Sequence, residues 1–283
     1  MEDIGKAEAA LEIAVHNTDL LVVSGSRLYG TETEDSDFDL IGFVIPPFEY
    51  LLGLKNFECR KLPDKDHKIF SLRRFLDLVL GGDPACTELF FVPPEKIIAI
   101  SDVGKKILSL RSCIISQAIY RRIMGYSYSE WRKAMGQKMI IEERSPTENT
   151  VVEDIRTIFQ PDKDDMDHVL EILLKDKERQ IVPSKVGLGE KRRKEFETCG
   201  YGVSSACHAI RLLDQVCQLM CYGEIKFPSS KAQILKQIRN GQISKIEAQK
   251  LYDEYHILAG NAKKRSVLPD KPDRNKVMMT YLD

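Results

Sequence analysis

A short apolar segment that runs into glycine and serine, with two acids soon after it, is the feature that most constrains this fold. Residues 20–24 form the apolar run, Gly25 and Ser26 follow it, and a second apolar segment carries Asp37 and Asp39 at alternate positions. Side chains alternate between the two faces of a strand, so the two carboxylates are predicted to point the same way. Carboxylates held side by side repel each other unless a cation lies between them.

This combination predicts chemistry on a phosphate-bearing substrate. Gly25 lets the backbone approach a phosphate closely, and free N–H groups at the start of a helix can hold that phosphate. Mg2+ binds carboxylate oxygens, keeps some of its waters and contacts substrate phosphates at the same time. A Gly-Ser turn alone is usually an ordinary turn, and an Asp-x-Asp pair alone is usually solvated. The two together, at this spacing, favour metal-assisted chemistry on a nucleoside triphosphate.

The composition is that of a globular protein without a strong charge bias. Of the 283 residues, 43% are hydrophobic and 30% are charged, and the formal net charge is −1. This length suffices for two ordinary domains, and the charge lacks the basic signature of many nucleic-acid-binding proteins. The seven Cys have no regular spacing, which predicts reduced thiols. No apolar run approaches the roughly 20 residues of a membrane span, so we expect a cytoplasmic protein without a membrane partner.

The pattern of apolar residues predicts an α+β fold in two parts. Strand-like alternation is confined to the first part of the chain, and helical periodicity dominates after Pro93 and Pro94. We therefore expect a small mixed β-sheet domain at residues 1–100 and an α-helical domain at residues 101–283. The expected strands are 20–24, 38–45 and 66–70, the expected helices include 2–16, 72–80 and 196–222, and residues 183–195 and the tail beyond 269 are expected to be mobile or weakly ordered.

At the level of motifs, the chain resembles the polymerase-beta-type nucleotidyltransferase superfamily. The superfamily signature is a small apolar strand, Gly-Ser and then an acid-hydrophobe-acid triplet, and Gly25, Ser26, Asp37 and Asp39 match it. The longer string Gly25-Ser26-Arg27-Leu28-Tyr29-Gly30, followed by Ser36-Asp37-Phe38-Asp39, is similar to a narrower branch. That branch contains predicted nucleotidyltransferases associated with phage-type RNA ligases, and looser similarity to it extends over residues 66–91 and 206–213.

The resemblance implies a metal-dependent nucleotidyltransferase that moves an NMP from an NTP to an acceptor hydroxyl. The N-terminal β-sheet domain would be the nucleotidyltransferase domain. Asp37, Asp39 and Asp66 would be the catalytic residues and would bind two Mg2+ ions, with Mn2+ as an alternative. Asp64 and Glu58 are alternatives to Asp66 as the third carboxylate.

The resemblance also implies a set of nucleotide-binding residues: Gly25, Ser26, Arg27, Tyr29, His208 and Arg211. The last two lie three residues apart, on one face of a helix. In that position Arg211 could bind a phosphate through two hydrogen bonds. The alternative is a histidine at the edge of the core beside an ordinary surface ion pair.

The partners are an NTP, for which ATP is the expected choice, and RNA as a candidate acceptor. Residues 120–133 interleave aromatic and basic side chains in a way that would suit RNA, although an amphipathic helix with a basic outer face has the same pattern. A second hypothesis is a nucleotide- or RNA-binding module without catalytic activity. The acceptor, the preferred NTP and the oligomeric state stay open at this point.

Overall fold

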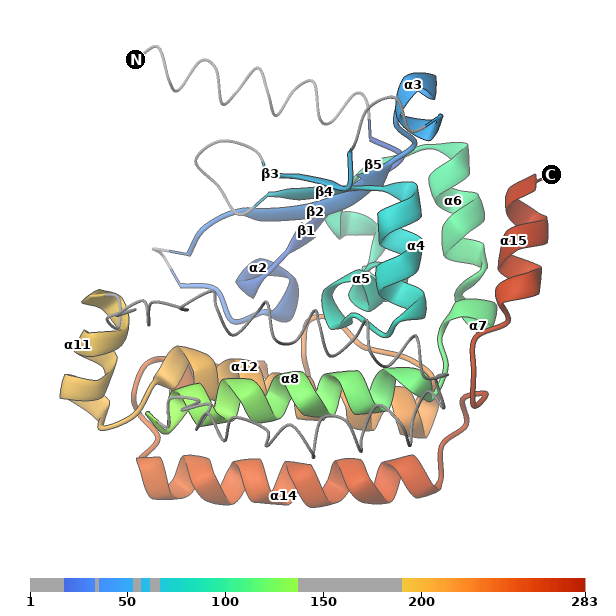
Figure 1. The fold of residues 1–283 in the computed structure, drawn as a ribbon. Helices are drawn as coiled ribbons and strands as arrows, with labels where there is room; N and C mark the ends of the chain where they lie inside the picture. The colour runs from blue at the N-terminus through green and yellow to red at the C-terminus, as the bar shows by residue number, and fades with distance from the viewer. Residues whose placement is uncertain (1–17, 34–35, 53–56, 62–66, 137–189, 283) are drawn as a thin grey trace, which may run out of the picture.

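The computed structural model describes residues 18–33, 36–52, 57–61, 67–136 and 190–282. In it, a five-stranded sheet lies over a layer of long helices (Figure 1). The strand order is β3-β4-β2-β1-β5, in which β2 and β4 are parallel and the other neighbours are antiparallel. A mixed sheet followed by a mostly helical remainder confirms the predicted α+β class. The strands are β1 (Leu20–Ser24), β2 (Asp39–Val44), β3 (Cys59–Lys61), β4 (Lys68–Ser71) and β5 (Ile97–Ile100).

Alternation along the strands gives the sheet two apolar faces. On β1 and β2, alternate residues point to opposite faces of the sheet. The residues on one face pack into the main core, and those on the other face form a smaller apolar cluster with Ile69 of β4. The residues in the main core are Leu20, Val22, Ile41 and Phe43, and those in the smaller cluster are Leu21, Val23 and Leu40. Because both faces are buried, the central strands read as continuous apolar runs in the sequence.

Short helices connect the strands, and two of them, α4 (Leu72–Leu80) and α5 (Pro84–Glu88), begin at a residue whose side chain caps the helix. The side chain of Ser71 accepts a hydrogen bond from the backbone N of Arg74, and the side chain of Asp83 accepts one from the backbone N of Cys86. Ser and Asp are among the residues that most often cap helices in this way. The other helices of this part are α2 (Ser26–Tyr29) and α3 (Phe48–Leu51), with two 3-10 turns at Leu89–Phe91 and Pro94–Lys96.

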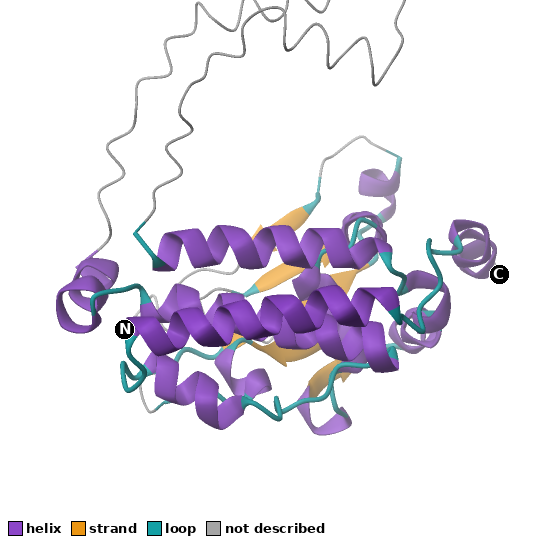
Figure 2. Cartoon of the chain, turned by 90° about the horizontal axis from the view of Figure 1, so that it is seen from below, coloured by secondary structure: helices purple, strands orange, loops and turns teal. Residues whose placement is uncertain are grey.

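The lower layer is built around one buried helix, α12 (Val203–Tyr222), which contacts α8, α13 and α14. Figure 2 shows the long helices of this layer lying side by side. Trp131 of α8 stacks on Tyr252 of α14 with ring centroids 4.2 Å apart, so these two helices also contact each other. The helices of this part are α6 (Asp102–Ser109), α7 (Arg111–Ile114), α8 (Ala118–Ala134), α11 (Glu190–Cys199), α13 (Ala232–Arg239), α14 (Lys245–Lys264) and α15 (Arg274–Leu282).

Three local expectations need correction. The helix predicted at 196–222 is two helices, because the chain turns at Gly200, whose φ of 75° is unfavourable for other residues, before α12 begins at Val203. The segment expected to be mobile is helical from residue 190 onward, and the tail beyond 269 contains α15. Strand β5 follows Pro93 and Pro94, where strands were expected to end, because it pairs with β1 through tertiary contact. The predicted helix at 2–16 lies outside the described residues.

Among the described residues, no helix is long and apolar enough to cross a membrane.

Candidate functional site

A cavity of about 600 Å3 lies where one end of the sheet meets the helical layer. The sheet contributes the end of β1 and the starts of β2 and β4 to its wall, and α2 and α5 continue the wall. Helices α8, α12 and α13 contribute the rest. This volume falls within the range of about 300–1,000 Å3 that is usual for ligand pockets. The cavity therefore is the candidate functional site.

The predicted Gly-Ser turn forms one edge of this cavity, directly against Asp39. Gly25 has φ 65° and ψ −149°, a conformation that is essentially restricted to glycine. A Cβ atom at Gly25 would lie 2.2 Å from Oδ2 of Asp39, so the turn and the carboxylate leave no room for a side chain. The antiparallel pairing of β1 with β2 places Ser24 opposite Asp39 and thereby brings the two motifs together.

The other predicted acids do not lie in the described wall of the cavity. Asp37 is exposed and lies before the start of β2, and it is not among the described residues that line the cavity. Asp66 and its alternative Asp64 lie outside the described residues. Glu58 is exposed and lies 3.9 Å from Arg74 in an ion pair. Among the described residues no group of three His, Cys, Asp or Glu side chains could hold a metal ion, so the metal ligands stay a prediction.

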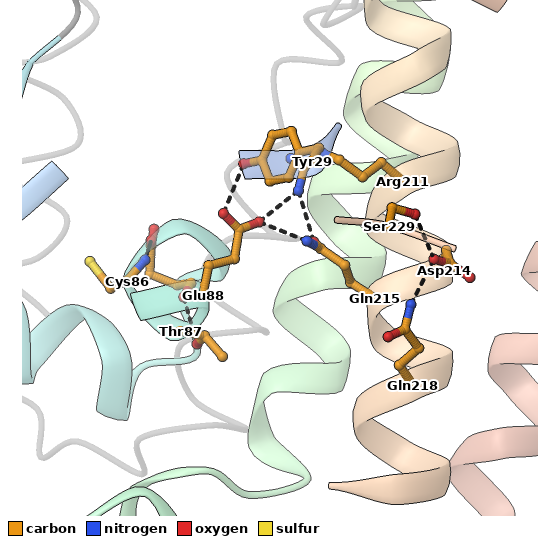
Figure 3. Close-up of polar contacts among 10 residues, drawn as sticks. Tyr29, Cys86, Thr87, Glu88, Arg211, Asp214, Gln215, Gln218 and Ser229 are labelled. Atoms are coloured by element: carbon orange, nitrogen blue, oxygen red, sulfur yellow. Dashed lines mark hydrogen bonds and ion pairs between the residues drawn. The ribbon is translucent and has the colours of Figure 1, made fainter. Parts of the chain in front are cut away.

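A buried polar network, drawn in Figure 3, includes Tyr29, Glu88 and Arg211 of the cavity wall. The hydroxyl of Tyr29 donates to Oε2 of Glu88 at 2.8 Å, and Nη1 of Arg211 donates to Oε1 of Glu88 at 2.6 Å. Gln215 completes the network, because its Nε2 donates to Oε1 of Glu88 at 2.9 Å and its Oε1 accepts from Arg211 at 2.9 Å. The guanidinium carbon of Arg211 also lies 3.9 Å from the centre of the Tyr29 ring.

This network joins α2, α5 and α12 and holds Arg211 in its charged form. The side chains of Arg211 and Glu88 are only 8% and 3% exposed. Burial alone would lower the pKa of Arg211, but the neighbouring Tyr29 and Glu88 raise it above its ordinary value. Removing either member of such a buried pair leaves the other charge uncompensated, which usually costs about 3–5 kcal/mol of stability.

His208 lies one turn before Arg211 on α12 and faces the cavity. Its side chain is accessible from the cavity, and the protein packed around it lowers its pKa. The positive charge of Arg211 acts in the same direction, whereas Glu130 opposes the shift. His208 is therefore neutral at pH 7 and can accept or donate one hydrogen bond at each ring nitrogen.

Arg27 takes a different place from the one that its motif suggests. Its Nη2 donates to the backbone O of Ser36 at 3.1 Å, and its guanidinium carbon lies 5.7 Å from the centre of the Phe38 ring. These contacts hold the loop that precedes β2. Gly25, Ser26, Tyr29, His208 and Arg211 line the cavity, whereas Arg27 is not among the described residues of its wall.

Several residues of the wall are not among the site residues predicted from the sequence. Glu88 is one of them, and the local signal near it is the helix start at Asp83 and Pro84. Lys68 and Arg239 also line the cavity, one from β4 and the other from α13. Nothing in the local sequence distinguishes these two from the many other basic residues of the chain.

The basic and aromatic stretch predicted at residues 120–133 forms α8, and its outer face reaches the mouth of the cavity. Tyr126 lines the cavity and is 42% exposed, and Tyr128 is 56% exposed. Arg122 lies 5.8 Å from the centre of the Tyr126 ring, and Arg132 lies 5.9 Å from that of Tyr128. Such a surface suits stacking on unpaired bases, and contact with RNA stays a prediction.

Comparison with known proteins gives one family and one curated relative. The model of the family described as RlaP, RNA repair pathway DNA polymerase beta family, matches residues 6–257. A protein of Enterobacteria phage T4, named as the uncharacterized 38.9 kDa protein in the nrdC-mobD intergenic region, is 32% identical over 101 residues. That alignment covers 31% of this chain and 30% of the phage protein. No solved structure matches the chain.

Proposed function

The chain belongs to the RNA repair pathway DNA polymerase beta family, and we propose that it is an active nucleotidyltransferase that uses an NTP, with ATP as the expected donor. In the proposed reaction an acceptor hydroxyl oxygen attacks the α-phosphorus and forms a new P–O bond. The bond from the α-phosphorus to the bridging oxygen breaks, and pyrophosphate leaves with that oxygen. The proton of the hydroxyl passes to a carboxylate of the site.

The observation that carries this proposal is the close approach of Gly25 to Asp39 at the edge of the cavity. A side chain at Gly25 would collide with Oδ2 of Asp39, so the glycine lets the backbone of the turn lie directly against this carboxylate. Backbone N–H groups around Gly25 and Ser26 would bind the β- and γ-phosphates, with help from the Ser26 hydroxyl. Tyr29 and Arg211 would shape the inner wall, and His208 would face the nucleotide as a neutral imidazole.

Mg2+ ions would complete the site. Carboxylate oxygens are the ligands that Mg2+ prefers, and Asp39 supplies such a group at the cavity. Asp37 and Asp66 are the other proposed ligands, with Asp64 and Glu58 as alternatives to Asp66. When bound, the ions would neutralise charge on the triphosphate and lower the pKa of the attacking hydroxyl.

The proposed acceptor is a hydroxyl at an RNA end. Tyr126 of α8 lines the cavity and is 42% exposed, so an unpaired base could stack on its ring where the cavity meets solvent. The family description, which refers to RNA repair, agrees with such an acceptor.

The test is transfer of label from each α-labelled NTP to a mixed RNA pool in the presence of Mg2+. We expect Asp39→Asn and the Asp37→Ala/Asp39→Ala double variant to lose activity at least about 100-fold, as is typical when a group that acts on the transferred proton or charge is removed. Asp102→Asn is the matched control, because Asp102 is an exposed acid paired with Lys105 far along the chain from the turn.

A binding module without catalysis is the second candidate, and the exposure of Asp37 outside the described cavity wall favours it. Mg2+-dependent binding of ATP with neither label transfer nor pyrophosphate release would support this candidate. It would contradict the proposed reaction.

A further inference from the structure

Four residues with basic side chains line the cavity within the described part of the chain: Lys68, His208, Arg211 and Arg239. A triphosphate is strongly negative, so the cations of the wall that are not already neutralised should decide where it lies. The four residues differ in how far their neighbours already neutralise their positive charge.

Two of them contribute little net positive charge to the cavity. Arg211 forms a buried ion pair with Glu88, with Nη1 and Oε1 2.6 Å apart, and the ring of Tyr29 covers its guanidinium. The pair is close to neutral as a unit. His208 faces the cavity without adding a fixed positive charge, because the protein packed around it and the positive charge of Arg211 lower its pKa.

The other two retain their charge. No ion pair joins Lys68 or Arg239 to a carboxylate of the described residues. Nη1 of Arg239 donates to the backbone O of Thr31 at 3.4 Å, which orients the side chain without neutralising it. A guanidinium has several more N–H donors, so Arg239 can bind a phosphate while it keeps this bond.

Their positions flank the turn that approaches Asp39. Lys68 begins β4 and pairs with Ile41 on the neighbouring strand β2, two residues after Asp39. Arg239 ends α13 and is bonded to Thr31, which follows the turn and α2 closely in the chain. One cation thus comes from the sheet and the other from the helical layer.

We propose that Lys68 and Arg239 are the charged side chains that bind the triphosphate of the nucleotide, beside the N–H groups of the turn at Gly25 and Ser26, whereas Arg211 is a structural cation held by Glu88. This inference rests on the proposed function and assigns the part of the substrate that the two cations recognise. It makes the enzyme selective for nucleoside triphosphates over monophosphates through two residues on different layers of the molecule.

The test is the affinity of the full-length protein for ATP and for AMP in the presence of Mg2+, measured by isothermal titration calorimetry. We expect Lys68→Gln and Arg239→Gln each to weaken ATP binding about tenfold, the usual effect of losing one charge-assisted hydrogen bond. AMP binding should change by less than about twofold, so the double variant should lose most of the preference for ATP.

Lys236→Gln is the matched control, since Lys236 lies one turn before Arg239 on α13 and is not part of the described cavity wall. It should leave both affinities unchanged. A double variant that keeps the preference for ATP would overturn the proposal, and so would one that loses affinity for ATP and AMP equally, which would indicate a general structural defect. If the wild-type protein bound no ATP, the proposed function itself would fail.

Discussion

At the scale of single residues, glycine and carboxylate positions carry the most information about this site. Gly25 is required by its backbone conformation and by the carboxylate beside it, and these two constraints are independent. Glu88 shows the opposite case, an acidic residue of the cavity wall that is only 2% exposed. Its burial is tolerable because Tyr29, Arg211 and Gln215 all donate to it. Both residues are therefore specified by their neighbours in space.

Gly25→Ala should damage stability and function together. The residue would be forced into a conformation that costs about 1–3 kcal/mol, and its Cβ would displace the carboxylate of Asp39. We expect a loss of this size in the free energy of unfolding in urea, together with loss of label transfer. Gly260→Ala on α14 is the control, because a Cβ there meets nothing within 4 Å. That variant should be more stable by about 0.5–1 kcal/mol and fully active, and a similar gain at Gly25 would refute the argument.

At the scale of elements, α12 organises the helical layer, and its start is held from outside the helix. The chain turns at Gly200, and the next residue, Tyr201, is completely buried. The hydroxyl of Tyr201 donates to the backbone O of Ile243 at 2.8 Å, in the connection between α13 and α14. One side chain thus ties the residues just before α12 to the connection between the two helices that follow it.

Tyr201 should make the protein sensitive to alkali. Burial raises its pKa from 10.0 to about 12. Between these pH values the unfolded chain loses the proton while the folded protein keeps it, so the stability that this group contributes falls as the pH rises. The slope is at most about 1.4 kcal/mol per pH unit.

Urea unfolding of the wild type and of Tyr201→Phe at pH 8 to 12 checks this. The variant should be less stable by about 1 kcal/mol at pH 8, because it lacks the hydrogen bond. The difference should shrink above pH 10. Tyr222→Phe is the control, since Tyr222 is 74% exposed and should leave the pH profile unchanged. A constant difference between wild type and Tyr201→Phe across this range would contradict the assignment.

At the scale of the whole molecule, the sheet and the helices share one apolar core. Buried residues of β1, β2 and α4 belong to the same cluster as those of α8, α12 and α14. The ion pair between Glu88 and Arg211 crosses the same junction and joins residues 123 positions apart. The division into domains at 1–100 and 101–283 stays a prediction, and a continuous core argues for cooperative unfolding of both parts.

Calorimetry tests this cooperativity. We expect a single thermal transition for the wild type, and Glu88→Ala should lower the stability of the whole molecule by about 3–5 kcal/mol because Arg211 loses its partner. Replacing both residues by Met should cost less than the single change, since no charge is then left buried. Two separate transitions, with only one of them moved by Glu88→Ala, would instead support independent domains.

Several local features of this fold can be predicted from the sequence, because they depend only on residues close together in the chain. Strand β1, the turn at Gly25 and helix α4 are such features, and the structure has them where the sequence predicts them. The α+β class follows in the same way from the change in apolar periodicity. The motifs at residues 25–39 also sufficed to predict the family to which the chain belongs.

The tertiary structure alone decided which charges meet. The sequence holds 42 Lys and Arg and 43 Asp and Glu, and no local rule selects Glu88 as the partner of Arg211 or brings Lys68 and Arg239 to one cavity. Likewise, β5 is a strand because β1 has an open edge beside it. Contacts between residues far apart in the chain depend on how the sheet and the helices pack together. Sequence patterns, which compare only neighbouring residues, therefore cannot predict these contacts.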